Sequence, residues 1–202
     1  MARKTRIAVF VSGGGTNLQA LLEAERDGML TDGEIVLVLS NNPNAYALER
    51  AKAFGVEGIC VDKKEYPDFA SRERETVRIL EEKQIDLIVL AGYLSILSAE
   101  FTARYEGRII NVHPSLIPSF CGKGYYGLKV HEAALSYGVK VTGATVHFVN
   151  EIPDGGKIIA QRAVEIQEGD TPELLQKRVM QEAEWKILPL ATQIVSKKLR
   201  GV

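Results

Sequence analysis

The sequence predicts an α/β fold in which helices cover both faces of a mostly parallel sheet. Three observations carry this prediction. Short continuous apolar runs, at residues 7–11 and 87–90 for example, are typical of parallel strands covered on both faces. Segments with helical spacing alternate with these runs, which indicates βαβ units. A Pro-Asp-Gly-Gly turn then joins two longer segments near the C-terminus, which predicts an antiparallel hairpin. The expected architecture is therefore a Rossmann-like three-layer sandwich with an antiparallel C-terminal hairpin.

The first half of the chain predicts four strands that alternate with four helices. We expect the strands at 7–11, 35–39, 58–61 and 87–90, and the helices at 18–26, 45–54, 69–83 and 98–105. Segments rich in glycine, asparagine and proline separate them. In an open sheet of this kind, ligands bind beyond the carboxyl ends of the strands. The segments that follow the strands are therefore the place to look for a site.

The second half predicts a change from parallel to antiparallel strands. A fifth strand begins at Ile109, and an amphipathic helix begins near His131, whose side chain we expect at the surface. Residues 141–150 and 157–165 form the hairpin. Thr171 is then expected to cap a single final helix, because a proline follows it in the first helical turn.

Composition is that of an ordinary soluble globule. The chain has 202 residues, of which 46% are hydrophobic and 25% charged, enough for one well-cored domain. Its net charge of −1 argues against binding nucleic acid through bulk electrostatics. No apolar run predicts a signal peptide or a membrane span. Cys60 and Cys121 lack metal-ligand spacing, so we expect no metal and a reducing, cytoplasmic compartment.

Asn111-Val112-His113 is the most informative motif. It follows two apolar residues directly, so both polar side chains are expected at a strand end, on one face because they are two residues apart. Asn111 brings an amide donor, and His113 an imidazole that can carry a proton near neutral pH. Acyl transfer needs donors for an oxyanion and a carrier for a proton. A capping Asn and a structural His remain the alternative.

A glycine-rich turn at 13–17 joins the first strand to the first helix. Backbone N–H groups and the helix dipole at such a position bind phosphate, although a plain tight turn has the same sequence. The dinucleotide fingerprint is incomplete, because Leu18 stands at the third glycine position and residues 40–42 contain no acidic residue. A dehydrogenase is therefore disfavoured.

Further polar candidates lie in the last third of the chain. Asp154 belongs to an Asp-Gly turn, yet it can also carry its carboxylate to His113, whose pKa it would then raise. Thr145 and His147 alternate with apolar residues, so they either support the sheet face or take part in the chemistry directly. Glu184, taken with its charged neighbours, is expected on a solvated helix face.

These motifs together resemble the phosphoribosylglycinamide formyltransferases, the glycinamide ribonucleotide transformylases that use 10-formyltetrahydrofolate. The resemblance covers about residues 7–190 and rests on segments 12–20, 40–51, 90–93 and 111–116 and on Asp154-Gly155. It implies the formyltransferase fold in one domain over residues 1–202. About 1–105 would form the phosphate-binding half, and about 106–202 the folate-binding and catalytic half. Methionyl-tRNA formyltransferase and formyltetrahydrofolate deformylase share the Asn-His signature, but each would carry an added domain.

The resemblance also implies a role for each site residue. Formyl transfer from 10-formyltetrahydrofolate to glycinamide ribonucleotide would serve de novo purine (IMP) biosynthesis, in a monomer or homodimer without metal, nucleic-acid or membrane partners. The catalytic residues would be Asn111, His113 and Asp154, supported by Thr145 and His147. The ribonucleotide would be bound by Gly15, Thr16, Asn17 and Glu184. The folate would be bound by Leu94, Ser95, Ile96, Leu97 and Asn111.

Two segments depart from the family pattern. Ser95 stands where many relatives have an arginine beside the pterin. For another arginine of the family, which contacts the folate and lies before the fourth strand, Arg72 is the candidate counterpart. Residues 121–127 replace a short Pro-Gly turn, and their glycines favour a mobile segment beside the site. Two other functions remain open on the sequence: a formyltetrahydrofolate hydrolase that needs no amine acceptor, and a nucleotide-binding sensor that catalyses nothing.

Overall fold

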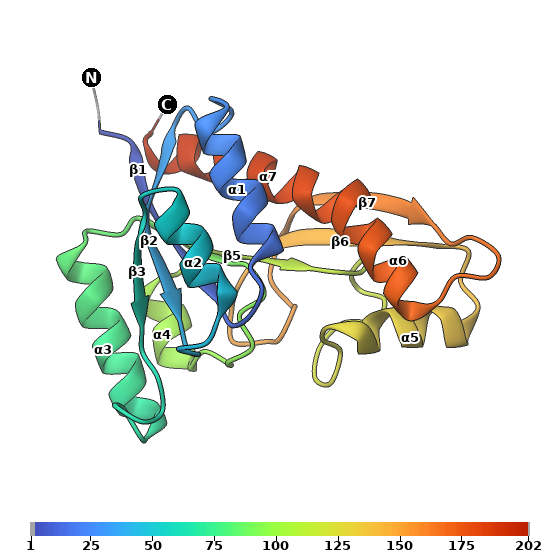
Figure 1. The fold of residues 1–202 in the computed structure, drawn as a ribbon, viewed down its shortest axis with the longest axis horizontal. Helices are drawn as coiled ribbons and strands as arrows, with labels where there is room; N and C mark the ends of the chain where they lie inside the picture. Colours follow the sequence, from blue (N-terminus) through green and yellow to red (C-terminus); the bar gives the residue numbers. More distant parts are fainter. Residues whose placement is uncertain (1–2, 202) are drawn as a thin grey trace.

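The computed structural model describes residues 3–201, which form a seven-stranded sheet with helices on both faces (Figure 1). The sheet has the order β3-β2-β1-β4-β5-β6-β7. The five parallel strands are β1 (Thr5–Val11), β2 (Gly33–Ser40), β3 (Glu57–Cys60), β4 (Leu87–Leu90) and β5 (Ile109–His113). The antiparallel strands are β6 (Val141–Phe148) and β7 (Ile158–Glu165). The predicted fold class is therefore confirmed, and the strand order reverses between β1 and β4, where doubly wound sheets bind ligands.

The sheet separates two apolar cores. In β1, Ile7 and Val9 face the first core, while Ala8 and Phe10 face the second. The first core is covered by α1 (Thr16–Arg26), α2 (Tyr46–Ala53), α6 (Pro172–Val179) and α7 (Trp185–Leu199), and the second by α3 (Phe69–Glu82) and α4 (Ala99–Arg104) (Figure 1). Burial on both faces explains why the parallel strands are continuous apolar runs. Among residues 3–201, no helix combines the length and apolarity needed to cross a bilayer.

Side-chain caps define where several helices begin. The side chains of Asp68, Ser98 and Thr171 accept hydrogen bonds from the first turns of α3, α4 and α6, respectively. Helix α1 begins two residues before the predicted start, because Gly15 at φ 73° turns the chain directly into the helix without a side-chain cap. The start of α6 at Pro172 agrees with the prediction from the Thr-Pro pair.

The single final helix predicted after Thr171 is wrong in one respect. A five-residue π-helical turn, η1 (Met180–Glu184), separates α6 from α7. Such wide turns insert one extra residue into a helix, and they occur frequently at functional sites. Here the turn carries Glu184, which is only 5% exposed. Sequence periodicity does not reveal it, because the flanking segments both keep ordinary helical spacing.

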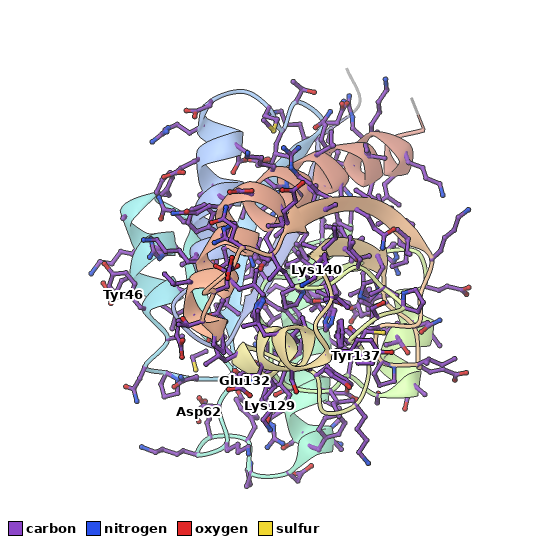
Figure 2. All side chains as sticks on the ribbon, turned by 90° about the vertical axis from the view of Figure 1, so that its right-hand side faces the viewer. Tyr46, Asp62, Lys129, Glu132, Tyr137 and Lys140 are labelled. Carbon is purple, nitrogen blue, oxygen red and sulfur yellow. The ribbon has the colours of Figure 1, made fainter. Side chains whose placement is uncertain are left out.

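Helix α5 (Leu128–Tyr137) contains the second correction. Figure 2 faces this helix, and its labelled residues Lys129, Glu132 and Tyr137 are all exposed. The side chain of His131, in contrast, is fully buried, so the expectation that it lies at the surface is wrong. His131 shares the buried face of α5 with Val130 and Ala134, and α5 packs against α6.

Candidate active site

The segments that follow β1, β2 and β4 are joined by hydrogen bonds at one edge of the sheet. Ser12 Oγ accepts a hydrogen bond from the N–H of Leu94 at 2.9 Å, and the main-chain carbonyl of Ser12 accepts one from Asn42 Nδ2 at 3.1 Å. Asn41 Nδ2 donates to Ser95 Oγ at 2.6 Å. The predicted phosphate turn and the predicted folate segment are therefore fixed relative to each other.

The turn before α1 accommodates only glycine at its last position. Gly15 has φ 73°, and a Cβ there would lie 2.6 Å from Cβ of Ala47. Arg50 Nε holds the preceding residue by donating to the carbonyl of Gly14 at 2.8 Å. Because Gly15 has no side chain to cap α1, the first N–H groups of the helix remain suited to an anion.

Asn17 and Glu184 are in direct contact beside this turn. Asn17 Nδ2 donates to Glu184 Oε2 at 2.6 Å, and the two residues are 7% and 5% exposed. Burial raises the pKa of Glu184 to about 7, although the hydrogen bond from Asn17 opposes the shift. The expectation of a solvated Glu184 is therefore wrong, because η1 turns this side chain inward. Thr16 lies close by, with Oγ1 3.6 Å from Sδ of Met180.

The antiparallel ladder of β5 and β6 places four polar side chains on one face of the sheet. Asn111 pairs with His147 and His113 with Thr145, and the intervening pair is apolar. Facing pairs in an antiparallel ladder project to the same side. The side-chain contact between Asn111 Nδ2 and His147 Nε2 is 3.3 Å. The motif of the fifth strand is thus completed by residues from the sixth.

Asp154 lies between the two imidazoles of this cluster. Its Oδ2 is 3.5 Å from Nδ1 of His113, and its Oδ1 is 3.5 Å from Nε2 of His147. The residue has φ 55° in the turn after β6, and its side chain is 14% exposed. The Asp-Gly turn therefore serves both as a turn and as the support of a carboxylate.

Two main-chain groups also contact the cluster. The carbonyl of Phe120 is 2.9 Å from His113 Nε2, and the N–H of Gly122 donates to Asp154 Oδ2 at 2.8 Å. Main-chain atoms carry no residue signature, so only the abundance of glycine after Phe120 pointed to this loop.

Burial dominates the protonation of His113. It lowers the pKa of His113 below the ordinary imidazole value, while the charge of Asp154 and the carbonyl of Phe120 oppose this shift. Asp154 therefore acts on this pKa in the predicted direction, but desolvation outweighs it. Burial by itself would raise the pKa of Asp154. The pKa nevertheless lies below the ordinary value, because the hydrogen bond with His147, the charge of His113 and the N–H of Gly122 all lower it.

Thr145 supports the chain that follows His113. Its fully buried hydroxyl donates to the carbonyl of Ser115 at 2.7 Å and accepts from the N–H of Ile117 at 3.1 Å. Gln161 Nε2, from the facing position on β7, donates to the same hydroxyl at 3.0 Å. Sequence reasoning overlooked Gln161, whose only signal was its place on the hairpin strand.

A cavity of about 150 Å³ brings the predicted folate residues to the polar cluster. Its lining includes Asn111, His147 and Asp154 on one side and the predicted folate residues Ser95, Ile96 and Leu97 on the other. Leu94 does not belong to this lining and is 68% exposed. Arg72 lies in a smaller adjoining cavity that is also lined by Ser95, Ile96 and Leu97. Over residues 3–201, no three His, Cys, Asp or Glu side chains are grouped to hold a metal ion.

An amide, an imidazole and a carboxylate at the end of a doubly wound sheet are the kinds of group that an enzyme of acyl or formyl transfer needs for an oxyanion and a proton. Residues 5–192 match the formyl transferase family. The chain therefore belongs to the formyl transferase family.

Several similar proteins carry one name within this family. Phosphoribosylglycinamide formyltransferase from Haemophilus influenzae is 40% identical over 185 residues, which cover 92% of this chain and 84% of that protein. The chloroplastic enzyme of the same name from Arabidopsis thaliana is 41% identical over 181 residues, 89% of this chain. The trifunctional purine biosynthetic protein adenosine-3 of Gallus gallus is 43% identical over 193 residues, 96% of this chain. The chain spans 62% of the Arabidopsis protein and 18% of the Gallus protein.

Solved structures agree over nearly the whole chain. Glycinamide ribonucleotide transformylase 1 from Symbiobacterium toebii has a TM-score of 0.89 and 39% identity, covering 96% of this chain and 89% of that one. Phosphoribosylglycinamide formyltransferase from Brucella melitensis has a TM-score of 0.87 and 40% identity, covering 96% of both chains. The present chain thus shares both fold and family with these enzymes.

Proposed function

We propose that this chain transfers the formyl group of 10-formyltetrahydrofolate to the amine of glycinamide ribonucleotide. Family membership and the names of its relatives support this assignment. The observation that carries it is the position of Asn111 and Asp154 in the wall of the cavity that residues 95–97 also line. A one-carbon unit held there would lie beside the amide of Asn111, the imidazole of His147 and the carboxylate of Asp154, with His113 behind that carboxylate at 3.5 Å.

The two substrates would occupy neighbouring parts of the same sheet edge. The ribonucleotide phosphate would lie at the turn of Gly15, Thr16 and Asn17, with Glu184 contacting the remainder of that substrate. The folate ring system would lie against residues 94–97 and Asn111. The hydrogen bonds that join the loops after β1, β2 and β4 support this arrangement, because they hold the two subsites at a fixed separation.

The proposed reaction is direct transfer without a covalent enzyme intermediate. The substrate amine attacks the formyl carbon, so a new C–N bond forms and the carbonyl oxygen becomes an oxyanion that Asn111 and His113 stabilise. The amine loses one proton, and the folate nitrogen gains one as its bond to the formyl carbon breaks. Asp154 would stabilise the imidazolium of His113 between these two transfers. Alignment of the two substrates can supply roughly 7–11 kcal/mol of the barrier reduction.

The remaining assignments follow from the same proposal. The chain would act on small molecules in the cytoplasm, as a monomer or homodimer, and would supply formylglycinamide ribonucleotide to purine biosynthesis. The half at about 1–105 would bind the ribonucleotide phosphate, and the half at about 106–202 would carry the catalytic residues. The names of the relatives, which refer to glycinamide ribonucleotide and to purine biosynthesis, support the substrate and the pathway.

A spectroscopic assay of 10-formyltetrahydrofolate loss, with and without glycinamide ribonucleotide, tests the proposal. Loss that requires the ribonucleotide is the expected result. Equal loss without it, with formate as product, would indicate a hydrolase. No loss in either mixture would contradict the proposed reaction altogether.

A further inference from the structure

The loop from Phe120 to Gly127 touches both members of the proposed catalytic pair through its main chain. Phe120 offers a carbonyl to His113, and Gly122 offers an N–H to Asp154. We propose that Gly122 is a positioning residue whose N–H holds the Asp154 carboxylate against His113, while the Phe120 carbonyl decides which nitrogen of His113 exchanges protons. This inference rests on the proposed function, since it concerns how the same site is prepared for its reaction.

The contact from Gly122 is the shortest polar contact of Asp154. The N–H of Gly122 is 2.8 Å from Oδ2, whereas His113 Nδ1 and His147 Nε2 are each 3.5 Å from the nearest carboxylate oxygen. A hydrogen bond to a charged acceptor is stronger than one between neutral groups, and its strength falls steeply as it lengthens. The orientation of the carboxylate between the two imidazoles is therefore set chiefly by the loop.

The contact from Phe120 determines the tautomer of His113. A carbonyl oxygen can only accept, so the nitrogen that faces it, Nε2, carries a hydrogen. In the neutral ring, Nδ1 then holds the lone pair, and this atom faces Asp154. A proton taken up by His113 must therefore arrive at Nδ1, where the carboxylate stabilises it.

Several contacts hold the loop in the conformation that makes these bonds. The Phe120 ring packs edge-on against Tyr125 and Tyr137, at centroid distances of 6.4 and 6.0 Å. Tyr137 belongs to α5, where Figure 2 labels it, so this ring pair connects the loop to a helix. The N–H of Tyr125 also donates to the carbonyl of Gly122 at 3.1 Å. The positions of Phe120 and Gly122 thus depend on several independent contacts.

The titratable groups around the pair are few. Three titratable side chains surround Asp154: His113 on β5, His147 on β6 and Cys121 in the loop. Burial raises the pKa of the Cys121 thiol. The charge of His147 also lowers the pKa of His113, and the charge of His113, after burial, lowers the pKa of His131 on α5. The chain contains only three histidines, so the ring resonances of all three can be assigned from single substitutions.

The substitution Gly122→Pro tests the proposal, because proline removes the N–H in any conformation of the loop. Gly124→Pro is the matched control. Both glycines have positive φ, 86° and 96°, which proline cannot adopt, and at neither does a Cβ meet any atom within 4 Å, so both substitutions change the local backbone of the loop. Of these two glycines, Gly122 is the one whose N–H donates to Asp154.

Nitrogen-15 NMR of the histidine rings gives a readout that does not depend on turnover. Neutral His113 in the unaltered protein is expected as the Nε2–H tautomer. Gly122→Pro is expected to lower the titration midpoint of His113 by about half a pH unit or more, since the carboxylate no longer faces the ring. In the formyl-transfer assay, kcat should fall on the order of tenfold with KM for both substrates nearly unchanged. Gly124→Pro should leave the midpoint and kcat close to those of the unaltered protein.

Three outcomes would overturn the proposal. These are an Nδ1–H tautomer in the unaltered protein, an unchanged His113 midpoint in Gly122→Pro, or the same shift in both proline variants. Failure of the proposed function has a different signature. The unaltered protein would then transfer no formyl group, while the tautomer and the Gly122-specific shift would still be seen.

Discussion

Asn17 and Glu184, which are 167 positions apart in the sequence, share a buried hydrogen bond of 2.6 Å. The bond links the start of α1 to the π-helical turn before α7, so the proposed ribonucleotide site is built from both ends of the chain. It also leaves a carboxyl group with a pKa of about 7 in the interior.

Glu184→Gln should change how the free energy of unfolding depends on pH. The folded carboxyl, at about 7, binds protons more readily than the unfolded one at the model value of 4.5. Stability from this group is therefore gained as pH falls from about 7 to 4.5, by up to about 3 kcal/mol. Denaturant unfolding at several pH values should show that Glu184→Gln loses this gain. Glu182→Gln, on the exposed side of the same turn, is the control and should keep it.

His131→Leu should have the opposite effect. Burial lowers the pKa of His131 to about 4 from an ordinary 6.5, so the unfolded state binds a proton first and stability is lost as pH falls between these values. Removal of the imidazole should abolish a loss of about 1–3 kcal/mol. Neither ring nitrogen has a hydrogen-bond partner among residues 3–201, so Leu should also be tolerated at pH 7.5. The prediction would be contradicted if the free energy of unfolding of this variant fell between pH 6.5 and about 4 as much as that of the unaltered protein.

His113→Ala and Asp154→Asn should fold normally but turn over slowly. Loss of one oxyanion donor or of its charged partner costs on the order of a hundred- to a thousandfold in kcat. The measurement is kcat in the formyl-transfer assay, with circular dichroism to verify the fold. Asp27→Asn, at an exposed carboxylate, serves as the control and should retain full activity. Near-normal turnover in both site variants would refute the catalytic assignment.

Gly15→Ala should weaken binding of the ribonucleotide. The added Cβ would lie 2.6 Å from Cβ of Ala47 at a backbone φ of 73°, so the turn must move. KM for the ribonucleotide should rise at least about tenfold, whereas KM for the folate should change little, because a displaced turn presents its N–H groups poorly to phosphate. Gly13→Ala, where a Cβ meets no atom within 4 Å, is the matched control. Equal effects of the two substitutions would argue against a phosphate site here.

Thr145→Val should destabilise the chain after His113, and Thr145→Ser should restore it. The valine removes a hydroxyl that serves Ser115, Ile117 and Gln161, and leaving such buried groups unpaired costs about 1–3 kcal/mol. Denaturant unfolding measures the loss, and kcat should fall several-fold because the same chain leads to Phe120. Full stability in the valine variant would show that the hydroxyl is dispensable.

The sheet could be predicted from the sequence because strands that are buried on both faces are continuous runs of apolar residues. Strand β1 is apolar at every position from Ile7 to Val11, and all five side chains are fully buried. The pairing of Asn111 and His113 on one face likewise follows from the two-residue period of a strand. Where a pattern has a simple physical period, the prediction and the structure agree.

The features that escaped prediction depend on contacts between distant segments. The prediction of an exposed His131 is wrong because nothing in its own helix reveals which face the rest of the fold covers. Glu184 was assigned to solvent because its neighbours are charged, whereas η1 turns it toward Asn17. The roles of Phe120 and Gly122 use main-chain atoms, which every residue possesses. The net pKa of His113 depends on burial, which outweighs a carboxylate that was correctly foreseen as a neighbour.

The polar cluster exists only in the observed register between β5 and β6. Val112 faces Val146 between the two polar pairs. If β6 shifted by a single residue, His147 and Thr145 would point to the opposite face of the sheet, and Val146 would face the cavity instead. No intermediate alignment retains half of the site. Mutations that loosen this ladder, even far from any substrate, should therefore abolish activity in discrete steps rather than erode it gradually.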